Sequence, residues 1–265
     1  MKNGCSVFFA VLIALGASWM GFVLGPSLQL GRAKLTTVLN STDVYPAQRT
    51  GEATLGLQVY RGNGCAACHT EQVRQDGIAF EVVLTVAGKK PVDVTNLMST
   101  LKLSGLTKEE ADAASDQLTA AGAKAEVRLS ATGTDMARGW GLRRSVAADF
   151  LYDYPVQLGN LRVGPDLADI GTRLADANVQ LLHLYAPKAV VNNSTMPSFK
   201  FLFEVRKIGA VPSDDALKLP PAFAPAAGCE IVPKPEAKQL VAYLLSLHAN
   251  VPLYEAPFTP ITAKP

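Results

Sequence analysis

The hydrophobic pattern of the chain begins with one long apolar run. Residues 7–24 (VFFAVLIALGASWMGFVL) are almost entirely apolar, and no charged residue occurs from Asn3 to Gly31. As a helix rising about 1.5 Å per residue, this run comes close to the roughly 30 Å hydrocarbon thickness of a bilayer. We predict a transmembrane anchor over residues 1–31. The alternative is a cleaved signal peptide, which we disfavour because the apolar run continues to Leu24.

Two further segments show helical periodicity. Residues 52–60 place Ala53, Leu57 and Tyr60 on one face. Residues 235–248 begin with proline, which suits a helix start, and carry apolar residues on one face. We expect this second segment to form a terminal helix that crosses the first.

Between Arg74 and Arg138 the pattern changes. Residues 80–86 are rich in β-branched side chains and lead to a turn at 88–90, and residues 125–129 read as a returning strand. Between them, residues 92–103 and 107–121 read as helices, and the second opens with a capping box of Thr107 and Glu110. The sequence thus predicts a β-α-α-β module over residues 78–134, inserted into a soluble domain of residues 32–265 that is otherwise mainly α. A looser insertion, rich in Pro and Ala, spans residues 211–232.

Composition excludes several classes of protein. The 265 residues are 48% hydrophobic and 18% charged, so a packed core is expected and disorder is not. The net charge is +2 and no basic block is present, which argues against nucleic acid as a partner. Four cysteines are too few for a disulfide scaffold in a chain of this length. Three histidines allow few sets of metal ligands.

One motif is a specific indication of a cofactor. Residues 65–69 read Cys-Ala-Ala-Cys-His, the C-x-x-C-H signature of covalent c-type haem attachment. Cys65 and Cys68 can each form a thioether to a haem vinyl group, and His69 can then serve as the proximal iron ligand. The alternatives are a zinc half-site, which lacks two further ligands, and a thioredoxin-type pair, which should follow a strand. We therefore predict one covalent haem c.

Haem attachment also fixes the expected topology. Thioethers to haem form outside the bacterial cytoplasm, so the amino terminus should lie inside and the domain after Arg32 in the periplasm. We expect a single-pass protein of the bacterial inner membrane. Cys5 and Cys229 would then lie on opposite sides of the membrane and could not pair within one chain.

Few residues could serve as the sixth ligand of the haem iron. The candidates are Met98, Met136, Met196, His183 and His248. Met196 lies in a polar Asn-Asn-Ser-Thr-Met-Pro-Ser loop, where a thioether has no reason to serve a core. We predict His69 and Met196 as the axial ligands, a pair that raises the reduction potential relative to two histidines.

A second motif, Arg-Val-Gly-Pro-Asp-Leu at 162–167, points to the same site. Gly-Pro favours a tight turn. The motif resembles one in c-type cytochromes in which the proline carbonyl oxygen accepts the Nδ1 proton of the proximal histidine. The resemblance implies the same contact between Pro165 and His69, which would orient the ring and raise its basicity. The other interpretation is an ordinary surface turn.

With the apolar run, the haem motif, the Gly-Pro turn and the methionine loop in this order, the chain resembles the membrane-anchored monohaem subunit (subunit II, CcoO/FixO type) of cbb3-type cytochrome c oxidases. The resemblance is carried by residues 64–74, 138–141, 145–153, 155, 158–159, 162–167, 170–171, 183–187 and 194–199. Glu71 stands where many relatives have Gln.

The resemblance implies a class I cytochrome c-like domain that relays electrons to an oxygen-reducing haem–copper subunit in aerobic respiration. By this resemblance the subunit has no catalytic residue of its own, and the oxidase activity belongs to the whole complex. The implied donor is a further cytochrome c subunit or a soluble cytochrome c.

Candidate partners for the haem propionates are Arg143, Arg144, Arg162 and Arg173, with Arg162 first because it adjoins the Gly-Pro turn. Alternatives are the cytochrome c subunit of a nitric oxide reductase-like complex, a free-standing anchored carrier, and a high-spin haem that binds a small ligand. The module is either a docking element or a surface embellishment.

Overall fold

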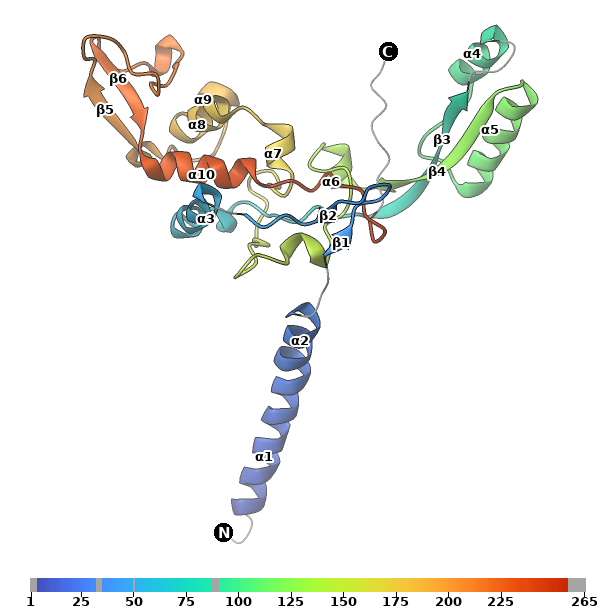
Figure 1. The fold of residues 1–265 in the computed structure, drawn as a ribbon, viewed down its shortest axis with the longest axis horizontal. Coiled ribbons are helices and arrows are strands. Elements are labelled where there is room, and N and C mark those ends of the chain that lie inside the picture. The colour runs from blue at the N-terminus through green and yellow to red at the C-terminus, as the bar shows by residue number, and fades with distance from the viewer. Residues whose placement is uncertain (1–3, 32–34, 50, 87–90, 257–265) are drawn as a thin grey trace.

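The structure is a computed structural model that describes residues 4–31, 35–49, 51–86 and 91–256. An apolar helical stalk projects from a body of short helices and two-stranded sheets, and a separate arm extends from that body (Figure 1). The described residues combine helices with three two-stranded sheets, which confirms the helical part of the predicted class, and the cytochrome c-like fold stays a prediction.

The stalk is one continuous helical stretch made of α1 (Gly4–Trp19), a π-helical turn η1 (Met20–Leu24) and α2 (Gly25–Gly31). Its segment Gly4–Gln29 has 26 residues, and an 18-residue stretch of it has a mean hydropathy of 2.3 and no buried residue. At about 1.5 Å per residue it is roughly 39 Å long, more than the hydrocarbon thickness of a bilayer. The helix is long and apolar enough to cross a membrane. The prediction of an apolar N-terminal helix is therefore confirmed.

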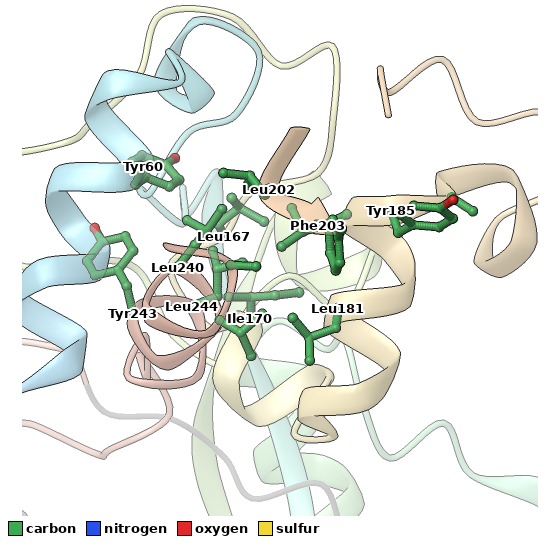
Figure 2. Packing of buried hydrophobic residues seen from close by; sticks show 14 of the residues in the cluster. Tyr60, Leu167, Ile170, Leu181, Tyr185, Leu202, Phe203, Leu240, Tyr243 and Leu244 are labelled. Carbon is green, nitrogen blue, oxygen red and sulfur yellow. The ribbon is translucent and has the colours of Figure 1, made fainter. Parts of the chain in front are cut away.

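The body is organised by the crossing of α3 (Glu52–Gly62) and α10 (Pro235–Leu245). Tyr60 of α3 and Tyr243 of α10 pack together with their ring centroids 5.2 Å apart and their planes tilted by 55°, and both are fully buried (Figure 2). The predicted crossing of the terminal helix over the helix before the haem motif is confirmed. The terminal helix ends at Leu245, a few residues before the predicted end at His248.

Short elements complete this core. Leu181, Leu184 and Tyr185 come from α8, and Leu202 and Phe203 come from the segment that leads into the β5–β6 hairpin (Figure 2). The remaining elements of the body are β1 (Thr36–Thr37), β2 (Val44–Tyr45), η2 (Cys65–Ala67), α6 (Thr134–Ala137), η3 (Ala147–Phe150), α7 (Ile170–Arg173), α8 (Ala177–Tyr185), α9 (Pro187–Val190), η4 (Lys200–Leu202), β5 (Phe203–Lys207), η5 (Pro221–Phe223) and β6 (Cys229–Pro233).

The hairpin of β5 and β6 was not predicted. These strands pair antiparallel from Phe203 opposite Pro233 to Lys207 opposite Cys229. The Pro- and Ala-rich segment between them, described above only as a loose insertion, is therefore the connection of a hairpin. Cys229 begins β6 and is a free thiol.

The arm has its own small core. Strands β3 (Gly77–Val86) and β4 (Lys124–Thr132) pair antiparallel, and helices α4 (Pro91–Thr100) and α5 (Lys108–Ala120) come between them in the sequence. Its buried side chains, among them Val82, Leu106 and Leu118, form a cluster that shares no residue with the core of the body. Thr107 accepts the Glu110 N–H while the Glu110 carboxylate accepts the Thr107 N–H, so the predicted capping box is present. The four predicted elements are confirmed, and the turn predicted at residues 88–90 lies outside the described residues.

The close approach of α3 and α10 depends on a glycine. A Cβ added at Gly56 would overlap the carbonyl oxygen of Gln239 and lie 2.7 Å from the Cβ of Tyr243. A Cβ at Gly62, in the same helix, would meet nothing within 4 Å. Of these two glycines of α3, only Gly56 is required by the packing.

We therefore expect Gly56→Ala to lower the free energy of unfolding by about 1–3 kcal/mol or more, because the two helices must separate. The matched control, Gly62→Ala, should leave stability unchanged or raise it by up to about 1 kcal/mol. Denaturant unfolding of both variants measures the difference. Equal stability of the two variants would contradict this account of the crossing.

Candidate functional site

The C-x-x-C-H segment is a tight turn that follows α3 directly. Gly64 adopts a left-handed conformation (φ 67°), and the next residues form the 3-10 turn η2. Both the Cys68 N–H and the His69 N–H donate to the Cys65 carbonyl oxygen, at 3.1 and 3.0 Å. The turn therefore holds the two thiols and the imidazole within one short segment at the edge of the core. Neither cysteine is in a disulfide.

This geometry weighs against the two competing chemistries. Burial raises the pKa of the Cys65 thiol to about 11, whereas a thioredoxin-type pair needs a thiol with a lowered pKa. Within the described residues, no group of three or more His, Cys, Asp and Glu side chains is arranged to hold a metal ion. A zinc half-site at Cys65 and Cys68 is therefore not completed by any residue that the structure describes.

The ring of His69 is held from two sides. Its Nδ1 lies 2.8 Å from the carbonyl oxygen of Pro165. Because a carbonyl oxygen can only accept, Nδ1 carries the hydrogen of the neutral imidazole, and Nε2 keeps a free lone pair. A Cβ at Gly164 would overlap the ring, so only glycine lets the turn lie flat against it. The contact predicted for the Gly-Pro turn is therefore present.

A buried aspartate locks this turn to the segment after His69. Asp166 is fully buried and accepts three hydrogen bonds, from the Thr70 hydroxyl at 2.5 Å, the Gln72 N–H at 2.8 Å and the Ala168 N–H at 2.9 Å. Hydrogen bonds to an ionised acceptor are stronger than neutral ones. Asp166 thus fixes the position of the Gly-Pro turn relative to the histidine. Spacing alone did not single it out, although it belongs to the 162–167 motif.

Arg162 is already engaged within the protein. Its guanidinium pairs with Asp135 at 2.5 Å, donates to the Gln72 carbonyl oxygen at 2.6 Å and lies over the Trp140 ring at 5.4 Å. Its Nε is buried and has no hydrogen-bond partner among the described residues. Arg162 therefore braces the segment after His69, and its Nε is the nitrogen left to meet another acceptor.

The other candidate arginines are also occupied. Arg143 is fully buried and binds both carboxylate oxygens of Asp149, at 2.7 and 2.9 Å. Arg144 donates to the carbonyl oxygen of Glu255 at 2.5 Å, and Arg173 donates to that of Asp166. Arg143 has no free surface to offer a cofactor.

Met196 follows α9 in a loop at the edge of the body core. It is half-buried and packs against the same cluster as Cys65. The loop is anchored by the Phe199 N–H, which donates to the Leu184 carbonyl oxygen at 2.9 Å. Cys65, Ala66, Met196 and Phe199 are each half-buried, and each packs against the core cluster of the body.

The structure adds a second candidate beside His69. His183, on α8, has its pKa lowered by burial and further by the nearby charge of His69. Sequence analysis named His183 among five candidates and preferred Met196; nothing local in the sequence shows that α8 approaches the C-x-x-C-H turn. The other candidates have other surroundings: His248 contacts Thr172, with Nδ1 3.1 Å from the hydroxyl, and Met98 lies in α4 of the arm.

Glu71 forms a buried polar centre behind the haem motif. It is 2% exposed, and the Tyr243 hydroxyl donates to its two oxygens at 2.8 and 3.0 Å. Burial raises the pKa of this carboxyl to about 8, opposed by hydrogen bonding to Tyr243 and Tyr60. The chain therefore holds an acidic group beside Tyr243 at the crossing of α3 and α10.

Comparison with known proteins supports the site. Residues 133–215 match the family described as "Cytochrome C oxidase, mono-heme subunit/FixO". The match contains the Gly-Pro turn and Met196, and it begins directly after β4. It confirms the resemblance to the mono-haem oxidase subunit over these residues. No curated protein matches the chain.

We expect Asp166→Ala to lower the free energy of unfolding by roughly 2–4 kcal/mol, because it leaves buried donors without an acceptor. The matched control is Asp176→Ala, which removes an ordinary helix cap, where the Asp176 carboxylate accepts from the Asn178 N–H at 2.8 Å. Such a cap contributes about 1 kcal/mol. Denaturant unfolding distinguishes them, and an equal loss in both variants would show that Asp166 has no special role.

Proposed function

We propose that this chain is the c-type electron-transfer subunit of a cbb3-type haem–copper oxidase. The observation that carries the proposal is the hydrogen bond between His69 Nδ1 and the Pro165 carbonyl oxygen at 2.8 Å. It joins the C-x-x-C-H turn, which lies outside the family match, to the Gly-Pro turn inside it.

The residues present suit one covalently attached haem c. Cys65 and Cys68 supply two free thiols, and the hydrogen bond to Pro165 leaves His69 Nε2 available for iron. The glycine at 164 keeps a flat surface behind the ring. When bound, the haem supplies a one-electron carrier whose potential depends on its axial ligands. The protein orients His69, and the bond from its Nδ1 raises the basicity of the ring.

Met196 is the proposed sixth ligand, and its half-buried position against the same core cluster as Cys65 supports this assignment. A thioether gives a higher potential than a second imidazole, which suits a carrier that feeds an oxidase. Two protein ligands would leave no open iron position, so oxygen reduction would belong to the partner subunit. His183 is the alternative ligand, favoured by its proximity to His69.

The apolar helix Gly4–Gln29 supports a single-pass anchor, with the haem domain on the periplasmic face of the bacterial inner membrane. The proposed partners are the catalytic haem–copper subunit and a donor that is a further cytochrome c subunit or a soluble cytochrome c. The family description favours an oxidase over a nitric oxide reductase-like complex or a free-standing carrier.

We also propose that residues 78–134 are an insertion that the haem site does not need. Gly77 and Thr132 are directly paired, so the two ends of the arm meet. The arm has a separate buried cluster, and the family match begins only at residue 133. Insertions of this kind are tolerated where the flanking residues lie close together.

Replacing the proposed sixth ligand tests the first proposal. Met196→Ala should abolish the weak absorption at the red edge of the visible spectrum that reports sulfur bound to ferric iron. It should also lower the potential by on the order of 0.1 V, within the roughly 0.8 V range that axial ligands span. Met98→Ala is the matched control, since Met98 lies in the arm and is 40% exposed. If the unmutated protein lacks this band, Met196→Ala leaves its spectrum and potential unchanged and His183→Leu changes them, the ligand is His183.

Removing the arm tests the second proposal. Replacement of residues 78–131 by a short Gly-Ser turn should leave the haem spectrum and potential unchanged, because Gly77 and Thr132 are already neighbours. Leu118→Asp in the full chain is the companion variant, since Leu118 is fully buried in the arm alone. Loss of haem attachment in both variants would show that the arm and the haem domain fold as one unit.

A further inference from the structure

One loop of the body has its polar residues inside and its apolar residues outside. We call residues 151–158 the apolar loop. Its exposed side chains are Tyr152, Tyr154 and Val156, at 41%, 93% and 42% exposure. Its buried side chains are polar, with Asp153 and Gln157 at 7% and 8% exposure. Asp153 is the only acidic or basic residue of the loop. Clustered exposed apolar side chains on a folded surface mark a contact site.

The loop is held firmly in this inverted arrangement. Asp153 forms an ion pair with Arg49, and the Gln157 amide donates to the Pro155 carbonyl oxygen at 2.7 Å. The Glu71 N–H donates to the Leu158 carbonyl oxygen at 3.2 Å. The buried polar groups thus fix the base of the loop, and the tyrosines and valine are presented to the outside by a fixed scaffold.

The same contacts place the loop near the anchor. Arg49 follows β2, which pairs with β1 only a few residues after the apolar helix ends. The segment before the loop is tied to the same region, since Arg143 lies over the Tyr45 ring at 5.6 Å. In Figure 1 the yellow-green segment around η3 lies at the lower edge of the body, on the side from which the helix α1–α2 descends.

We propose that the apolar loop is a second membrane contact, with Tyr152, Tyr154 and Val156 inserted among the lipid headgroups of the bilayer that the N-terminal helix crosses. Tyrosine is enriched at this depth, because its ring is apolar and its hydroxyl remains wet. The absence of exposed charge from the loop removes the main cost of entry. The inference rests on the proposed function only in requiring the anchor.

Lipid suits the loop better than a protein partner for two reasons. The loop is continuous with the region where the anchor meets the body, so it faces a surface that is present whether or not other subunits are bound. Its exposed side chains offer amphipathic rings and no charged group for a specific ion pair. A single helix leaves the domain free to tilt, and a second contact would fix its orientation over the membrane.

Thiol accessibility tests the inference on the full chain in phosphatidylcholine nanodiscs, in a Cys5→Ser, Cys229→Ser background. Tyr154→Cys reports the loop, and Val211→Cys is the matched control, since Val211 is 75% exposed and lies after β5. Val11→Cys reports the anchor. A hydrophilic maleimide should modify Val11→Cys and Tyr154→Cys several-fold more slowly than Val211→Cys, with rates normalised to each unfolded chain.

Each other result has a defined meaning. If Val11→Cys is protected and Tyr154→Cys reacts as fast as Val211→Cys, the lipid contact is wrong while the anchor stands. If Tyr154→Cys is then protected only in the whole complex, a protein subunit covers the loop instead. If Val11→Cys reacts fast as well, the proposed membrane anchor is wrong, and the proposed lipid contact of the loop is wrong too.

Discussion

The hydrogen bond from His69 Nδ1 to the Pro165 carbonyl oxygen is the contact on which the rest of the site depends. It connects two segments that are far apart in the sequence, and each is locally constrained: the first by the 3-10 turn of η2, the second by Gly164. The fully buried Asp166 ties the same two segments through Thr70 and Gln72. The imidazole is thus oriented by rigid backbone on both sides, as a metal ligand requires.

Behind this contact, the protein accommodates a buried carboxyl that an all-apolar core would not contain. Glu71 lies between α3 and α10, where the Tyr243 hydroxyl donates to both of its oxygens. Burial raises the pKa of Glu71 to about 8, so the neutral form predominates at pH 7. A protonated carboxyl can itself donate, and the buried hydroxyl of Tyr60, which lacks another partner, can accept. Protonation therefore reconciles an acidic residue with a tightly packed helix crossing.

Local features of this chain could be predicted from the sequence, and so could the α3–α10 crossing and the contact between His69 and Pro165, which rest on motifs; most other contacts between distant segments could not. The apolar helix, the capping box at Thr107 and the Gly-Pro turn each depend on residues a few positions apart, and each is present. The β5–β6 hairpin was missed because Phe203 and Pro233 are separated by a proline-rich connection that hides their pairing. The proximity of His183 to His69 and the engagement of Arg162 by Asp135 arise only when separate elements pack together.

The base of the arm is closed by contacts between residues that are far apart in the sequence. Its ends meet at the Gly77–Thr132 pair, and Asp76 accepts the Thr134 N–H at 2.8 Å directly beside that pair. Asp135, the next residue, accepts the Arg74 N–H and pairs with Arg162. The hydrogen bonds that close the base of the arm therefore run directly into those that brace the segment after His69. A change of sequence within the arm is separated from the haem motif by this closed base, which explains how so large an excursion can interrupt the chain close to its most constrained turn.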